Sequence, residues 1–240
     1  LEEAKELPNR IFFTVPALTP DVPGLETAGA DLRCDSIAAL LQESNVQGLG
    51  EMQGVSNPRQ AYHRDRVLID DMLSAAFLSG SLGKTTEGNA PGLSGAELAA
   101  HILICGGETS CHETTTKEEC LEKLRNGVTV FMREGSTQKN MAACIRVVTE
   151  DGVDSRKLVL CTDDMTAADL LNHGHMAEAV RRTIACGIDP VEAIQMATVN
   201  PALHYGHREL GVIAPGKCAD LCLVGDLTEM DVQAVVLRGK

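Results

Sequence analysis

Short apolar runs alternate with helical segments from residue 10 to residue 161, and this alternation restricts the fold more than any other feature. The strand-like runs are RIFFTV (10–15), VQGLGEM (46–52), TTEG (85–88), ETSCH (108–112), VTVFM (128–132) and LVLC (158–161). Segments with helical apolar spacing, such as SIAALLQES (36–44), separate them. Strands that are joined through helices run parallel, so the sequence predicts an α/β fold with a parallel sheet.

The number of strands separates a closed barrel from an open sheet. A closed parallel barrel needs eight strands and typically about 250 residues, whereas six strand candidates precede a change of pattern near residue 165. We therefore predict an incomplete TIM-type (β/α) barrel over residues 1–205, with about six βα units and terminal helices. Two-residue alternation around Pro215 and Gly216 then predicts a small, partial β-sandwich appendage over residues 206–240.

The charge balance excludes two classes of partner. The 34 acidic and 21 basic residues give a formal charge of −13, which repels phosphate backbones and anionic lipid headgroups. Hence we expect neither a nucleic acid nor a membrane partner. Scattered cysteines without a CxxC pair, and the absence of an apolar run near the roughly 20 residues that span a bilayer, predict a cytoplasmic protein. The charged start LEEAKELPNR lacks an initiator methionine and suggests a fragment.

Polar side chains stand where four of the apolar runs stop. These residues are Glu51, Asn89, His112 and Asp163. In a parallel barrel the carboxyl ends of the strands form the functional face, so these side chains are expected to converge there. Carboxylate and imidazole donors hold Zn²⁺, Mn²⁺ or Fe²⁺, which activate water. The pattern indicates metal-assisted hydrolysis, although a single aspartate after a strand is more often a helix N-cap.

A His-x-His pair at His173 and His175 offers a competing metal site. On a strand, the two imidazoles would point the same way, but Gly174 lies between them and a helical pattern follows. We therefore expect the pair to flank a helix. The chain contains no Walker loop, dinucleotide fingerprint or G-x-S-x-G motif.

Several longer motifs resemble bacterial-type adenine deaminases, within the metal-dependent amidohydrolase superfamily. They are LETAGADL, GLGEM, GNAPGLSG, SCHETTT, LEKLRNGVTVFMREGS, LVLCTDD, IQMATVNPALHYG and GVIAPGKCADL, which occur in this order along nearly the whole chain. The final motif is shared by many amidohydrolases. The run from SCHETTT through MREGS to CTDD is the most specific for substrate.

This resemblance implies a TIM-type barrel in which metal-activated water attacks C6 of adenine to give hypoxanthine and ammonia, a reaction of purine salvage. The implied metal ligands are Glu51, His112 and Asp163, and Asp163 is also the implied proton shuttle. Further implied site residues are Glu134, as a second catalytic residue or a structural ion-pair partner, and Glu113, Arg133, Ser136 and Asp164, as lining of the substrate pocket. The expected cofactor is a divalent metal, Mn or Fe, with Zn as the alternative.

The chain departs from the family pattern at four places. Asn89 stands where the family has a histidine ligand, and an amide binds these metals poorly. Cys111 replaces the aspartate that usually precedes the histidine equivalent to His112. The family's first barrel strand, with its His-x-His pair, would lie upstream of Leu1, and most of the family's later C-terminal region has no counterpart.

These departures leave three hypotheses about function. The chain is an adenine deaminase or a partial copy of one, whose activity in isolation is in doubt. Alternatively, it is another amidohydrolase that acts on cyclic amides or aminated rings. The third alternative is an inactive remnant, or a barrel completed by a complementary fragment or by self-assembly as a homo-oligomer.

Overall fold

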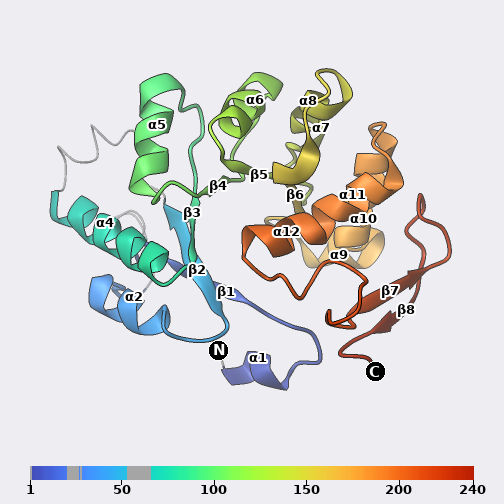
Figure 1. Cartoon of the computed structure of the whole chain (residues 1–240), viewed down its shortest axis with the longest axis horizontal. Helices are drawn as coiled ribbons and strands as arrows, with labels where there is room; N and C mark the ends of the chain where they lie inside the picture. Colours follow the sequence, from blue (N-terminus) through green and yellow to red (C-terminus); the bar gives the residue numbers. More distant parts are fainter. Residues whose placement is uncertain (1, 21–26, 28, 53–65) are drawn as a thin grey trace. The chain divides into compact units, whose positions relative to one another are not determined.

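Parallel strands alternate with helices from β1 to β6 in the computed structural model, which describes residues 2–20, 27, 29–52 and 66–240 (Figure 1). These residues pack as two units, residues 1–113 with 125–128 and residues 114–124 with 129–240. Each unit buries its own apolar side chains. The alternation confirms the predicted α/β class and is that of an incomplete TIM-type barrel.

The first unit contains four strands whose neighbours pair in parallel and in chain order. They are β1 (Phe13–Pro16), β2 (Val46–Met52), β3 (Thr85–Gly88) and β4 (Ser110–Cys111), with helices α1 (Glu2–Glu6), α2 (Cys34–Leu40), α4 (Arg66–Ser81) and α5 (Gly95–Ile104). Helices α2 and α4 bury Ile37 and Met72 in one cluster with Leu49 of β2. Each such side chain contributes about 1.5–3 kcal/mol when it leaves water.

The register of the first unit aligns the carboxyl ends of three strands. Met52 of β2 lies opposite Gly88 of β3, and Gly88 lies opposite Cys111 of β4. Glu51 precedes Met52, and the residues that follow Gly88 and Cys111 are Asn89 and His112. Asn89 and His112 therefore each lie one residue beyond this aligned row, and Glu51 lies one residue before it.

The second unit is built on β5 (Thr129–Arg133) and β6 (Leu158–Cys161), which pair in parallel. The surrounding helices are α6 (Lys117–Arg125), α7 (Met141–Cys144), α8 (Arg146–Thr149), α9 (Ala167–His173), α10 (Met176–Ala185), α11 (Pro190–Ala197) and α12 (Val199–His204), with one 3₁₀ turn (Ser155–Lys157). Val130, Leu158 and Met196 are fully buried between strands and helices. No helix in the described part of the chain is long and apolar enough to cross a membrane.

The C-terminal strands form a separate sheet. Strands β7 (Leu221–Val224) and β8 (Val232–Val236) pair antiparallel, so the predicted β structure in this region is present. The Pro215–Gly216 turn does not join them, because it precedes β7. The connection runs over residues 225–231, where the Gly225 N–H donates to the Asp231 carbonyl at 2.8 Å. The division at residue 205 remains a prediction.

Capping residues fix the start of two helices of the second unit. Thr116 Oγ1 accepts from the Glu119 N–H at 3.2 Å, and the Glu119 carboxylate accepts from the Thr115 N–H at 3.0 Å. This exchange is close to a capping box and fixes the start of α6. Asp189 caps α11 through the Val191 N–H at 2.9 Å.

Cys186 belongs to an apolar pattern of helical spacing, which predicts a buried thiol, but this prediction is wrong. Cys186 is exposed, because α10 ends at Ala185 and Cys186 lies in the turn before Gly187. The buried face of α10 consists of Ala179, Val180 and Thr183.

Candidate functional site

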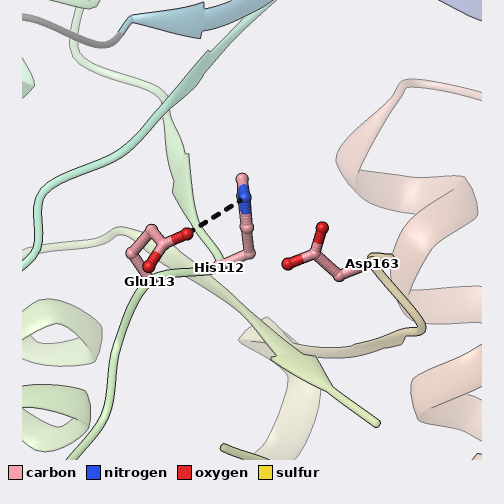
Figure 2. A group of neighbouring side chains, drawn as sticks. All are labelled: His112, Glu113 and Asp163. Atoms are coloured by element: carbon pink, nitrogen blue, oxygen red, sulfur yellow. Dashed lines mark ion pairs between the residues drawn. The ribbon is translucent and has the colours of Figure 1, made fainter. Parts of the chain in front are cut away.

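The first unit brings one imidazole and two carboxylates together at its strand ends. His112 Nε2 lies 3.1 Å from Glu51 Oε1 and 3.8 Å from Glu113 Oε1. Figure 2 shows the Glu113 carboxylate directed at the His112 ring, with the ion pair as a dashed line. The His112 side chain is 19% exposed and that of Glu51 is 45% exposed. This set is half-buried and accessible from solvent, as a ligand site requires.

Asn89 lies one residue beyond β3 and is only 5% exposed. Neither Oδ1 nor Nδ2 of its side chain has a hydrogen-bond partner among the described residues. An unsatisfied buried polar group costs about 1–3 kcal/mol, so the Asn89 amide does not stabilise the fold through a hydrogen bond to the described residues. Cys111 is different, because it is fully buried and its Sγ accepts from the Ala90 N–H at 3.4 Å.

The second unit carries Asp163 two residues after the end of β6, where an arginine forms an ion pair with it. Arg133 Nη1 lies 2.8 Å from Asp163 Oδ2, and the Arg133 side chain is 4% exposed. Burial, together with the nearby charge of Asp163, raises the pKa of the neighbouring Cys161 thiol to about 12. Cys161 is therefore a neutral thiol at pH 7.

The backbone is left-handed at two of the predicted ligands. The φ angle is 27° at Glu51 and 58° at Asp163, and the other non-glycine residues with positive φ in the described part are Met230 and Arg238. Side chains with a Cβ rarely adopt this region, and such conformations cluster at functional sites. Glu51 lies within β2 where its pairing with β3 is irregular, between Leu49 and Met52, and Asp163 lies in the loop after β6.

His112, Glu113 and Asp163 supply the nitrogen and oxygen donors that borderline divalent metals accept (Figure 2). The structure places His112 and Glu113 with Glu51 in the first unit and Asp163 with Arg133 in the second. These residues lie at or just beyond the carboxyl ends of parallel strands. Their imidazole and carboxylate groups are donors that a divalent metal accepts.

The remaining predicted site residues lie in the loops that follow β5 and β6. Glu134 is 8% exposed, and its Oε1 pairs with Arg182 at 3.1 Å and Lys139 at 3.5 Å. The Ser136 N–H donates to the Asp164 carbonyl at 3.0 Å. Ser136 Oγ accepts from the Thr166 N–H at 2.8 Å. Ser136 therefore braces the loop that carries Asp163 and Asp164.

Gly135 makes the close approach of these loops possible. A Cβ built at Gly135 would lie 2.7 Å from the Asp164 carbonyl oxygen and closer still to that of Thr162. Both atoms are backbone, so the Gly135→Ala variant must displace the Asp163 turn. We expect it to lower the melting temperature.

The control for this variant is Gly80→Ala. Gly80 lies in α4, its φ is not positive, and nothing lies within 4 Å of its Cβ position. We expect this variant to stabilise by about 0.5–1 kcal/mol. Equal melting temperatures for the two variants, measured by calorimetry, would contradict the steric account of Gly135.

The His-x-His pair flanks helices, as predicted. His173 is the last residue of α9, and His175 precedes α10. The ring Nε2 of His175 lies 3.2 Å from Thr162 Oγ1. Sequence reasoning did not single out Asn140 and Thr114, which the structure connects to Arg133. The polar loop REGSTQKN before α7 carried the signal for Asn140, since asparagine is typical before a helix.

Comparison with known proteins gives concordant results. A family model described as the amidohydrolase family matches residues 92–240. The chain is 56% identical over 239 residues to adenine deaminase 1 of Carboxydothermus hydrogenoformans, covering all of this chain and 40% of that protein. It is 41% identical to an adenine deaminase of Desulfatibacillum aliphaticivorans, again over all of this chain and 40% of the relative. The chain thus spans about 40% of the length of these curated relatives.

Solved structures show the same fold at low sequence identity. An enamidase, described as a member of the amidohydrolase superfamily, matches with a TM-score of 0.52 and 20% identity over 72% of this chain and 51% of its own. A crystallised amidohydrolase matches with a TM-score of 0.57 and 16% identity over 91% of this chain and 62% of its own.

Proposed function

Because the chain belongs to the amidohydrolase family, we propose that its strand-end residues form part of an adenine deaminase site. The reaction is the hydrolysis of adenine to hypoxanthine and ammonia. Relatives named adenine deaminase align with the whole chain at up to 56% identity. The observation that carries the proposal is the ion pair of His112 with Glu51 at the carboxyl ends of β4 and β2, whose registers align through β3.

A divalent metal is part of this proposal. Glu51, His112 and Asp163 would hold the ion, and Asn89 would offer a neutral amide oxygen. The mixed nitrogen and oxygen donors suit Mn or Fe, with Zn as the alternative. When bound, the ion supplies Lewis acidity, which lowers the pKa of water towards 7. The close approach of His112 to Glu51 and the unsatisfied Asn89 amide support a bound cation here.

Asp163 would carry the proton in this mechanism. Water contributes oxygen to C6 of adenine while the C6–N6 bond breaks and ammonia leaves. A carboxylate that takes a proton from water and passes it to the departing amine serves both steps. Arg133 holds Oδ2 of Asp163 and so fixes the direction of the other carboxylate oxygen.

The remaining predicted residues have supporting roles in the proposal. Glu113, Arg133, Ser136 and Asp164 would line the substrate pocket. Glu134 remains the second predicted catalytic residue, but the ion pair of its buried carboxylate with Arg182 favours a structural role.

The test uses two proteins, because the chain spans about 40% of its relatives. One is the 240-residue chain, and the other is a chimera in which this chain replaces the matching segment of the Carboxydothermus hydrogenoformans relative. Each is loaded with Mn²⁺ and offered adenine or a cyclic amide such as a hydantoin, while ultraviolet absorbance and ammonia are recorded. We expect the chimera to convert adenine and to ignore the cyclic amide.

The outcomes separate the three hypotheses. If the chimera is active and the 240-residue chain is not, the remaining segments must be supplied by another polypeptide or by a longer chain. Turnover of the cyclic amide in preference to adenine would identify a different amidohydrolase. A folded chimera that binds Mn²⁺ but releases no ammonia from adenine would refute the proposal.

A further inference from the structure

Asn140 holds the end of β5 through its side-chain oxygen and its backbone N–H. The side-chain Oδ1 accepts from the Arg133 backbone N–H at 2.5 Å, and the Asn140 backbone N–H donates to the Arg133 carbonyl at 3.1 Å. Both backbone groups of Arg133 are therefore bonded to one residue. Asn140 is 4% exposed, so water does not compete for these bonds.

The opposite end of the Asn140 amide reaches the segment that follows Glu113. Its Nδ2 donates to the Thr114 carbonyl at 2.7 Å. Thr114 is fully buried, and its Oγ1 accepts from Lys123 Nζ at 3.0 Å. Thr114 is thus fixed through its carbonyl and its hydroxyl, two residues after the proposed ligand His112.

The side chain of Asn140 does not serve the helix that it precedes. Asparagine is favoured before a helix because its oxygen accepts from the first backbone N–H groups. Asn140 precedes α7 but makes no side-chain capping bond. A residue that forgoes the favoured local bond for two non-local ones indicates a requirement elsewhere in the structure.

We propose that Asn140 is a positioning residue for the reaction, which sets the orientation of Asp163 through Arg133. The two hydrogen bonds with Asn140 fix the Arg133 backbone at the last residue of β5, from which the guanidinium reaches Asp163 Oδ2 at 2.8 Å. Aspartate lacks the donor that meets the Thr114 carbonyl, and leucine lacks both the donor and the acceptor. This inference rests on the proposed function, because Asp163 matters only as a metal ligand and proton carrier.

The test compares Asn140→Leu with Asn200→Leu. Asn200 is an equally buried asparagine of the second unit, and its Nδ2 donates to the Ser155 and Leu158 carbonyls at 2.9 and 2.8 Å. It lies at the opposite end of β6 from Asp163. Asn140→Asp is the milder second variant, because it retains the acceptor for the Arg133 N–H. Melting temperature, Mn²⁺ affinity by calorimetry, kcat and KM for adenine are measured for each.

Loss of a residue that orients a ligand typically costs about 10–100-fold in metal affinity or activity. We expect this loss in Mn²⁺ affinity and kcat for Asn140→Leu, a smaller loss for Asn140→Asp, and a KM within about threefold of wild type. Asn200→Leu is expected to lower the melting temperature alone. Equal kcat and Mn²⁺ affinity in the two leucine variants would overturn the inference. If wild type binds Mn²⁺ without converting adenine, the proposed function fails, and Mn²⁺ affinity still decides the role of Asn140.

Discussion

Replacement of Asp163 by asparagine is expected to lower kcat for adenine by about 10²–10⁴-fold, the usual contribution of a general acid–base residue. Asparagine has the same shape and still accepts a hydrogen bond from Arg133, but it cannot take up a proton. The loss therefore reports on proton transfer rather than on folding. The measurement is steady-state turnover by the Mn²⁺-loaded chimera, with bound metal quantified in each sample.

The matched control is Asp154→Asn. Asp154 lies before β6, where it caps the turn through the Arg156 N–H at 2.9 Å, whereas Asp163 lies after the same strand. An identical substitution at the amino end of the strand is expected to leave kcat unchanged. Retention of kcat within about threefold by metal-loaded Asp163→Asn would remove Asp163 from the mechanism.

Glu119→Gln is expected to destabilise the second unit strongly, because it leaves a buried lysine without its carboxylate. Lys123 Nζ lies 2.7 Å from Glu119 Oε1, and the side chains of Lys123 and Glu119 are 0% and 14% exposed. Breaking a buried ion pair from one side typically costs about 3–5 kcal/mol. Glutamine can still accept from the Thr115 N–H, so the start of α6 is retained.

The free energy of unfolding in urea measures this effect, with Glu118→Gln as control. Glu118 is the neighbouring acidic residue of the same first turn and is exposed, so its charge contributes little. A difference below about 1 kcal/mol between the two variants would show that the Lys123 ammonium is satisfied without Glu119.

Local patterns predicted much of the fold. The runs at 46–52 and 85–88 are β2 and β3 with the expected bounds, because β-branched or apolar residues bounded by turns specify short strands. Glu51, Asn89, His112 and Asp163 could be proposed as site residues for the same reason, since the ends of strands are visible in sequence.

Other features depend on contacts between distant residues. Thr114 and Asn140 are 26 positions apart. Nothing in the sequence around either residue indicates that the Asn140 side-chain amide donates to the Thr114 carbonyl. The expected strand at 108–112 is reduced to Ser110–Cys111, because only these residues keep ladder pairing. The left-handed backbone at Glu51 and Asp163 accompanies the irregular pairing of β2 near Glu51 and the loop after β6, and sequence spacing did not predict it.

The measurement that tests the central claim most directly is the position of bound Mn²⁺ in crystals of the chimera, located from its anomalous scattering. The account predicts a peak about 2.0–2.3 Å from donor atoms of Glu51, His112 and Asp163, which disappears in Asp163→Asn crystals or loses occupancy. A peak that none of these three residues contacts, in a protein that still converts adenine, would contradict it.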